Sequence, residues 1–578
     1  MAQRDEHNAS GNPKQASPAT RPAQYSEASP RDKLRQAAES LRNVIIERFY
    51  HNFRDFWADR QPLTWALAIV IGVAVGYGAI TFRYLIGIVQ LPWLHSTSER
   101  VVSAAAGVPW WNLVLAPAIG GVIVGAILQR FMPGRRAHAV ADVIEARALR
   151  DCKIDVRTGL LSAGLAILSL GSGASAGREG PVVHLGATIA SWLEEKFRLS
   201  AASRRSLLAS GVGAAVAASF NAPIAGVLFA HEVILGHYAV RAFVPIVIAS
   251  VAGAVISRIH LGNFPAFAIP QYQITTYLEF PAFALLGVTC AIVAILFQFA
   301  VMAAERIIWN FEMPLWLRTG LGGLAVGTMA LVFPQVLGVG YETTDQALYQ
   351  ALPLSLLIGL IVAKTIATAI TLAVRFAGGV FSPSLYLGAV TGAAFGTIAT
   401  STFPDVGASH GLYAILGMGA VAASVLGAPI STTLICFELT GGYEMTIALL
   451  LTVSISVGLT QTLLGQSFFH WQLGKRGLFL QDGPHKSIMR RLTVASFMSD
   501  AEPDGDGPRR LASDSDEAWL MASDTLERAL RTFDKAGTTR VAVVADSDPT
   551  LIIGWADRMQ ALNAFNKALI DAAVEEHR

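Results

Sequence analysis

Two glycine-rich segments contain residue types that could bind a small anion. Gly177–Pro181 reads Gly-Arg-Glu-Gly-Pro, Gly378–Pro383 reads Gly-Gly-Val-Phe-Ser-Pro, and an apolar stretch follows each of them. Because proline suits the first turn of a helix and glycine leaves backbone N–H groups uncovered, each segment predicts a bare helix N-terminus. Such an end carries unpaired donors and a partial charge of about +0.5. Converging helix ends could therefore bind an anion without the full charge that would prevent its release.

Close packing of membrane helices is an alternative explanation of these glycines. The two ionisable residues of the first segment, Arg178 and Glu179, favour anion binding instead. Ionisable residues inside a membrane region are expensive to bury, so they are functional by default.

The composition of the chain is that of a membrane protein. Of its residues, 53% are hydrophobic and 15% are charged, with a mean hydropathy of +0.47, whereas soluble proteins have about 25% charged residues. The net charge of +2 gives no indication of nucleic acid as a partner. Several apolar runs are long enough to span a bilayer as helices, and segments interrupted by Gly and Pro, typical of helices that line a cavity, lie between them. The long runs are Leu63–Thr81, Leu113–Leu128, Ala242–Ile256, Pro281–Ala303, Gly320–Val332, Ala351–Ala373 and Met445–Leu464.

The apolar region repeats itself. Gly211–Ile224 aligns with Gly417–Ile430 at an offset of 206 residues, and the same offset pairs Glu232 with Glu438. A second, upstream match occurs in the same order at nearly the same offset. The chain is therefore predicted to contain a duplicated half, and two inverted halves that meet at the midplane are a common transporter plan.

Basic residues flank the apolar region and predict its orientation. Residues 1–31 are polar, which is typical of a disordered tail, and Asp32–Arg60 has the pattern of an amphipathic helix. By the positive-inside rule, we expect a multi-pass protein of the cell membrane with both termini in the cytoplasm. Residues 1–60 would then be a cytoplasmic tail and helix. The flanking basic residues are Arg42, Arg48, Arg54 and Arg60 before the first run, and Lys475, Arg476, Lys486, Arg490 and Arg491 after the last.

The two glycine-rich segments resemble two signature motifs of the CLC family of chloride channels and proton-coupled chloride transporters. Asn221–Phe229 and Gly417–Glu438 resemble the family as well, and the similarity covers almost the whole apolar region. The resemblance implies an all-α polytopic membrane protein, with a CLC-type inverted-repeat helical bundle over residues 61–477 and halves of roughly 61–260 and 270–477. It also implies a homodimer in the lipid bilayer, with one chloride pathway in each subunit.

The resemblance assigns roles to individual residues. Glu179 would be the gating glutamate, whose carboxylate plugs the outer anion site and swings away on protonation or when chloride competes. Arg178 would provide positive potential at the outer mouth. Gly180 and the backbone N–H groups of Val380 and Phe381 would belong to the anion site, with chloride as the transported ion.

The third signature of the family departs from its usual pattern in this chain. Ala137–Asp142 reads Ala-His-Ala-Val-Ala-Asp, where the family normally has Gly-Ser-Gly-x-Pro-Glu, so His138 stands where a serine touches the ion. An imidazole N–H can also donate to chloride, more strongly when it is protonated; alternatively, His138 is a loop histidine that faces the cytosol. The late tyrosine of the family aligns with Phe469, which has no hydroxyl group, unless the alignment shifts by one residue to His470.

One position bears on whether chloride movement is coupled to protons. In proton-coupled members a glutamate follows the residue that matches Glu232, and here Val233 occupies that relay position. Because valine cannot take up a proton, the favoured function is a passive, gated chloride channel. The alternatives are a proton-coupled chloride antiporter and, less favoured, a fluoride or other anion exporter. His231 could titrate near neutral pH, although a packed histidine is the simpler interpretation.

Other function classes are not favoured by the sequence. We recognise no metal-ligand cluster, nucleophile constellation or phosphate-binding loop in the apolar region, so we expect neither an enzyme nor a cofactor. The three cysteines match no metal-binding spacing.

Residues 478–578 are predicted to form a small cytoplasmic α/β domain. Ser499–Asp516 is acidic and rich in Gly, Pro and Ser, which is typical of a linker. The order helix, strand, strand, helix resembles a degenerate CBS domain, the regulatory module that often follows CLC membrane domains. Because Leu492–Met498 resembles the opening of a second copy that is cut short, we expect a structural brace of the dimer rather than a nucleotide site. The predicted elements are a helix at Ser523–Lys535, strands at Arg540–Ala545 and Leu551–Trp555, and a helix at Ala556–Val574.

Overall fold

The described part of the chain divides into two units, one that ends at Gln61 and one that begins at Pro62. In the first unit the described residues between Leu41 and Ala58 are helical, as the amphipathic pattern predicts, and most of their large apolar side chains are exposed. The predicted polar tail of residues 1–31, and all but the first two residues of the predicted linker, lie outside the described residues. The computed structural model describes residues 41–42, 45–46, 48–54, 56–262, 277–403, 410–440, 443–478, 488–489, 492–500 and 518–577.

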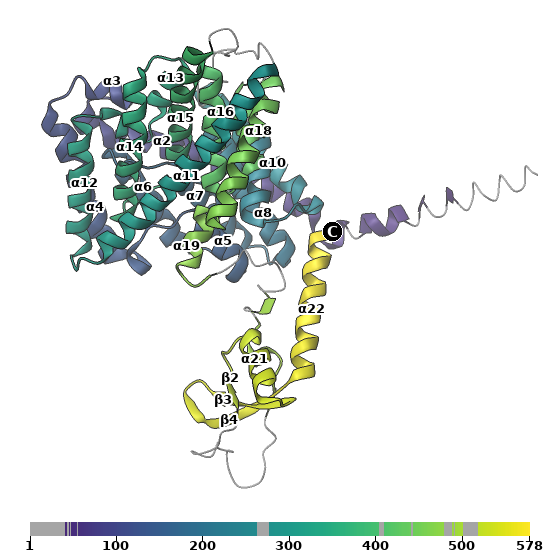
Figure 1. The fold of residues 1–578 in the computed structure, drawn as a ribbon. Coiled ribbons are helices and arrows are strands. Elements are labelled where there is room, and N and C mark those ends of the chain that lie inside the picture. Colours follow the sequence, from purple (N-terminus) through teal and green to yellow (C-terminus); the bar gives the residue numbers. More distant parts are fainter. Residues whose placement is uncertain are drawn as a thin grey trace, which may run out of the picture. The chain divides into compact units, whose positions relative to one another are not determined.

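Helices form the apolar region of the second unit (Figure 1). The first half contains α2 (Gln61–Leu94), α3 (Val101–Ala105), α4 (Trp110–Phe131), η1 (Pro133–Arg135), α5 (Val140–Leu149), α6 (Val156–Gly171), α7 (Glu179–Glu194), α8 (Ala201–Phe220), α9 (Pro223–Phe229), the π-helix η2 (Ala230–Leu235) and α10 (Val240–Leu261). The second half contains η3 (Tyr277–Glu279), α11 (Phe280–Trp309), α12 (Leu315–Ala330), η4 (Pro334–Val336), α13 (Tyr341–Leu348), α14 (Leu354–Ala373), α15 (Phe381–Thr402), α16 (His410–Leu426), α17 (Pro429–Thr440), α18 (Tyr443–Leu464) and α19 (Phe468–Gly474). The fold class predicted from the sequence, an all-α polytopic bundle, is confirmed.

Six helical stretches among the described residues are long and apolar enough to cross a membrane, namely α2, α4, α10, α11, α14 and Met445–Gly474. The segments interrupted by Gly and Pro form shorter apolar helices, as expected, among them α6, α17 and the pair α9 and η2. The apolar run Gly320–Val332 lies mostly in α12, which has 16 residues and is not among these six stretches. This helix packs so closely on α4 that a Cβ at Gly323 would lie 2.0 Å from the carbonyl oxygen of Pro117.

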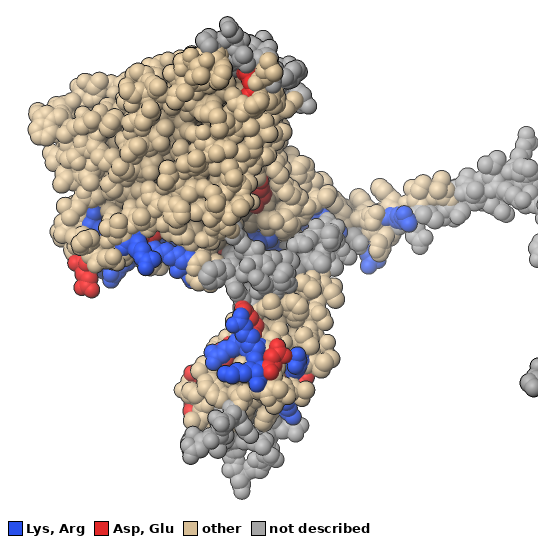
Figure 2. Space-filling view, viewed as in Figure 1, with Lys and Arg blue, Asp and Glu red and all other residues tan. Residues whose placement is uncertain are grey.

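The surface of the helical unit separates an apolar side from a basic end. In the view of Figure 2 its side is almost free of charged residues, and Lys and Arg gather at its lower edge. Helices α5 and α19 lie at this lower edge, which we call the basic end, and α3 and α13 lie at the opposite end, which we call the far end (Figure 1). Large exposed apolar side chains, such as Ile119, Leu160 and Ile292, suit contact with lipid rather than water.

Reciprocal contacts join the two predicted repeats. The carboxylate of Glu232 accepts hydrogen bonds from the two backbone N–H groups that follow Pro429, at 3.0 and 2.8 Å, and so caps α17. The carboxylate of Glu438 caps α9 in the same way, through the two N–H groups that follow Pro223, at 2.9 and 2.7 Å. A carboxylate at a helix N-terminus accepts hydrogen bonds from the free N–H groups and interacts favourably with the helix dipole. Each glutamate thus caps a helix of the other half, as expected of two halves related by a pseudo-twofold axis. The two glutamates are the ones that the sequence repeat aligned.

The described residues from 492 onward form a small α/β unit. A four-stranded sheet has the order β1 (Ser499–Asp500), β4 (Asp548–Asp557), β3 (Arg540–Ala545), β2 (Trp519–Met521), with only β2 and β3 parallel. The helices are η5 (Val494–Ser496), α21 (Leu526–Ala536) and α22 (Arg558–His577). Both predicted strands and both predicted helices are confirmed, whereas β1 and β2 are too short to show in the sequence pattern.

The interpretation of Leu492–Met498 as the opening of a truncated second copy is wrong. Val494 and Phe497 lie in the same apolar core as Leu526 and Phe533. The backbone N–H of Val494 also donates to the carbonyl oxygen of Asp524 at 2.8 Å. The segment therefore completes the single α/β unit.

Candidate functional site

The two glycine-rich segments meet at the starts of α7 and α15. The backbone N–H of Gly177 donates to the carbonyl oxygen of Gly379 at 2.7 Å, and the N–H of Gly379 donates to the oxygen of Gly177 at 2.8 Å. The N-cap residues Arg178 and Val380 make no side-chain capping bond. Two bare helix N-termini therefore converge, as the sequence predicts, and together they favour a negative charge between them.

The carboxylate of Glu179 occupies the space between these helix ends. The side chain is 1% exposed. The hydroxyl of Tyr341 donates to its Oε1 at 2.5 Å, and the hydroxyl of Ser382, on α15, donates to Oε2. Gly177 has to be glycine here, because a Cβ would lie 2.9 Å from Oε2 of Glu179 and 2.9 Å from the backbone N of Ser382. The predicted gating residue is thus held by two hydroxyl groups, neither of which the sequence analysis singled out.

Arg178 has an acidic partner that the sequence analysis also missed. Its buried guanidinium forms an ion pair with Glu99, in the loop before α3, and lies 4.7 Å from the centre of the Tyr341 ring. Glu99 also pairs with Arg83, at 2.8 Å. These residues line a cavity of about 320 Å³ at the far end, together with Gly340. The positive potential expected of Arg178 is therefore partly balanced by a carboxylate. No sequence signal marks Glu99, because it lies 79 residues from its partner in an ordinary loop.

A smaller cavity of about 90 Å³ reaches the helix starts from the basic end. His138, Pro181, Gly378 and Phe468 line it. His138 is half-buried and lies at the wall of this cavity, a position from which its ring could contact an anion. Phe469, the predicted counterpart of the family tyrosine, is buried and does not line this cavity; its neighbour Phe468 does.

The remaining predicted site residues are all buried. Phe381, the first residue of α15, packs its ring against Phe220 and Phe229 at 5.1 and 5.8 Å. Gly180 approaches Gly379 so closely that a Cβ would lie 3.4 Å from its Cα. Val233 is 8% exposed, within the π-helix η2. The relay position is thus a buried apolar side chain.

His470, the alternative counterpart of the family tyrosine, has its own partner. Its ring Nδ1 lies 2.9 Å from Oγ of Ser467, the residue just before α19. Neither residue lines the cavity at the basic end. A shift of the alignment by one residue therefore adds no residue to the lining of this cavity.

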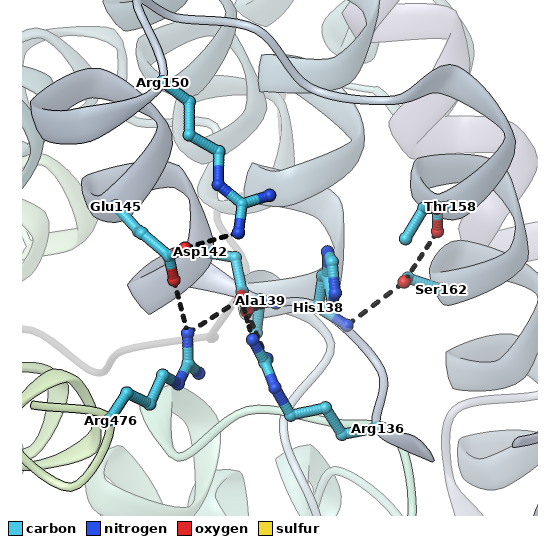
Figure 3. Close-up of polar contacts among 9 residues, drawn as sticks. All are labelled: Arg136, His138, Ala139, Asp142, Glu145, Arg150, Thr158, Ser162 and Arg476. Atoms are coloured by element: carbon cyan, nitrogen blue, oxygen red, sulfur yellow. Dashed lines mark hydrogen bonds and ion pairs between the residues drawn. The ribbon is translucent and has the colours of Figure 1, made fainter. Parts of the chain in front are cut away.

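The backbone and ring of His138 are both fixed. Its N–H donates to Oγ of Ser162 at 3.1 Å, and Ser162 donates in turn to the carbonyl oxygen of Thr158 at 2.8 Å (Figure 3). The ring packs edge-on against that of His184, with centroids 5.5 Å apart. Burial lowers the pKa of His138, and the nearby charge of Asp142 offsets this only in part. The ring is therefore neutral at pH 7, and a donor role rests on its neutral N–H group.

Asp142 connects the loop of His138 to α5 and to the segment after α19 (Figure 3). It accepts hydrogen bonds from the backbone N–H of Ala139 at 2.9 Å, from Arg136 at 3.0 and 2.5 Å, and from Arg476 at 2.9 Å. Burial alone would raise the pKa of Asp142, but the hydrogen bond and charge of Arg136, with the charge of Arg476, hold this pKa well below its usual range. The carboxylate stays ionised, so the three segments remain tied together.

The basic end has an excess of positive charge around its cavity. Glu145 pairs with Arg476 at 3.0 Å and with Arg150 at 2.6 Å. A further acid at this end, Glu305, pairs with two more basic residues. The five basic residues of these pairs exceed the three acids by two charges, which attracts anions to the cavity. The basic residues are Arg136, Arg150, Arg375, Lys475 and Arg476, and the acids are Asp142, Glu145 and Glu305.

Comparisons with known proteins agree with this geometry. The chain matches the family model described as voltage gated chloride channel over residues 120–461. It is 30% identical to the voltage-gated ClC-type chloride channel ClcB of Escherichia coli over 416 residues, which cover 71% of this chain and 98% of that protein. Two solved structures have a similar fold. A slow cyanobacterial Cl−/H+ antiporter has a TM-score of 0.63 and 22% identity, over 73% of this chain and 99% of that one. A CLC-type fluoride/proton antiporter has a TM-score of 0.59 and 23% identity, over 71% and 97%.

The matched residues include both glycine-rich segments and both reciprocal helix caps. The chain therefore belongs to the voltage-gated chloride channel family, the CLC family.

Proposed function

We propose that this protein conducts chloride passively across the membrane and that Glu179 is its gate. Membership of the family supports chloride transport as the general function. The observation that carries the gating role is the position of the Glu179 carboxylate, buried between the uncapped starts of α7 and α15. Because the carboxylate has the charge of chloride, it competes with the ion for the same donors. Movement of this one side chain would open the path between the far-end cavity and the basic-end cavity.

Val233 supports passive rather than proton-coupled transport. A buried apolar residue at this position interrupts the route that would bring a proton from the basic end to Glu179. The relative in Escherichia coli is named a channel. The two structural neighbours are antiporters, but they are less than 25% identical to this chain, so they support the fold alone.

A proton-coupled antiporter is the second candidate, and His184 favours it. This histidine is 1% exposed, lies against His138, and neither of its ring nitrogens has a hydrogen-bond partner among the described residues. A buried imidazole pair beside the basic-end cavity could pass a proton without the missing acid.

The proposal includes the orientation and the assembly of the protein. Placing the basic end in the cytoplasm follows the positive-inside rule. Ile224 and Ile430 are equivalent residues of the two repeats, at the starts of α9 and α17, and are 53% and 46% exposed. This apolar surface is suited to contact between two copies of the chain in a homodimer.

Purified protein in liposomes with crossed chloride and proton gradients tests the proposal. A passive channel gives a reversal potential at the chloride Nernst value and no uphill proton movement. Proton pumping at a fixed ratio would overturn passive conduction, and a faster flux of fluoride than of chloride would indicate an exporter of that ion. Val233→Glu restores an acid at the relay position, and Val233→Leu is the matched apolar control. If Val233→Glu leaves coupling unchanged, the assignment of the relay position is wrong.

A further inference from the structure

A residue that is distant in the sequence holds the carboxylate of Glu179. Tyr341 begins α13, 162 residues after Glu179, and its hydroxyl donates to Oε1 at 2.5 Å. Both side chains are buried, at 7% and 1% exposure. A hydroxyl that donates to an ionised carboxylate forms a stronger bond than one between neutral groups, and water cannot easily replace it at a buried site.

Contacts of the residues just before Tyr341 fix the backbone of this segment. Gly340 has a φ of +91°, and a Cβ there would lie 2.6 Å from Cδ2 of Tyr386. The buried amine of Lys364 donates to the carbonyl oxygens of Val336 and Gly338, both at 3.0 Å. The phenol is therefore anchored by its own backbone, while the carboxylate it contacts belongs to a side chain that can rotate.

We propose that Tyr341 is a latch for the gate: its hydroxyl holds the ionised Glu179 carboxylate in the closed position, and Ser382 holds the second oxygen. The inference rests on the proposed gating role of Glu179. The charged and titratable groups around the carboxylate are Arg178, 3.9 Å away, Tyr341, and Glu99 behind Arg178. Because the hydroxyls bind the carboxylate more tightly than the neutral acid, the latch makes opening require a lower pH or a higher chloride concentration.

Removing the latch should open the gate more easily. Tyr341→Phe keeps the ring and its contact with Arg178 but removes the donor. We expect the pH of half-maximal chloride flux to rise by about one unit, a tenfold change in proton concentration. Flux at neutral pH should rise, and the chloride concentration for half-maximal opening should fall. Tyr413→Phe is the matched control: it also removes a buried hydroxyl, on α16, from a ring packed against Phe283 and Phe395, and should leave the pH profile unchanged.

Two further variants separate the latch from the gate. In a Glu179→Gln background, Tyr341→Phe should have no additional effect on the pH profile. Ser382→Ala removes the other donor and should shift the profile in the same direction, which provides a second test if Tyr341→Phe does not fold. If Glu179→Gln abolishes the pH dependence while Tyr341→Phe and Ser382→Ala leave the midpoint in place, the latch is refuted and the gate stands. If Glu179→Gln retains the pH dependence, the proposed gate itself is refuted.

Discussion

Replacement of Asp142 by asparagine tests whether the contacts at the basic end hold the His138 loop in place. The carboxylate accepts four N–H groups within 3.0 Å, three of them from arginines. The single amide oxygen of asparagine can serve about two of these donors, and its NH₂ group would face Arg136. Each charge-assisted bond contributes about 1.5–3 kcal/mol. Because the side chains of Arg136 and Arg476 are 21% and 24% exposed, water recovers part of this loss, so we expect the free energy of unfolding to fall by about 3 kcal/mol.

The assay is unfolding of the detergent-solubilised protein in SDS, followed by tryptophan fluorescence, together with chloride flux in liposomes. Asp546→Asn is the control, because this aspartate accepts bonds from Ser523 at an exposed site of the α/β unit, and it should change stability by less than about 0.5 kcal/mol. Loss of the fixed loop should also weaken chloride binding at the His138 side. Wild-type stability and wild-type flux in Asp142→Asn would refute the positioning role.

The contribution of Asp142 to the free energy of unfolding depends on pH in a definite direction. Because the folded state lowers the pKa of Asp142, its stabilisation is present above the unfolded pKa and is lost as the pH falls through the lower folded pKa. Between pH 5 and pH 8 the carboxylate is ionised in both states, so its contribution is constant over this window of about three pH units. Any pH dependence of chloride flux in that range therefore arises elsewhere.

Four further substitutions have distinct expected outcomes. Glu179→Gln should abolish the pH dependence of chloride flux in liposomes. Gly177→Ala places a Cβ 2.9 Å from the Glu179 carboxylate, so it should displace the gate and raise flux at neutral pH, unlike a change outside the site. Glu99→Gln leaves the charge of Arg178 unbalanced and should lower the chloride concentration for half-maximal flux, an effect that high salt weakens. Glu438→Gln removes a charged helix cap and should lower the free energy of unfolding in SDS by about 1 kcal/mol.

The sequence predicts the parts of the site that depend on local backbone chemistry. Glycine and proline at fixed positions specify helix starts whatever the rest of the fold does, so the ends of α7 and α15 and the place of Glu179 could be predicted. Tyr341 and Glu99 could not, because each approaches its partner only through the packing of distant helices. The choice between Phe468 and Phe469 also depends on packing, since one residue along a helix turns a side chain by about 100°.

The predicted elements show the same division between local and distant signals. Helices α21 and α22 and strands β3 and β4 of the α/β unit have clear patterns, so the sequence predicts them. The three-residue β2 is stabilised by its neighbour β3 and not by a pattern of its own. The apolar run Gly320–Val332 lies mostly in the 16-residue α12, and the close contact of this helix with α4 explains its composition.

The hydrogen bonds between the two repeats restrict how the pathway can open. Six of the described hydrogen bonds cross the boundary between the repeats, two at each glutamate cap and two between Gly177 and Gly379. A rocking motion of one half against the other would have to break these bonds together, which would uncover the capped starts of α9 and α17. Rotation of the Glu179 side chain breaks the hydrogen bonds to Tyr341 and Ser382 and the 3.9 Å contact with Arg178. If Glu179 is the gate, as proposed, the pathway opens by movement of one side chain within a fixed frame, and its rate of opening should depend on side-chain chemistry far more than on bilayer thickness or tension.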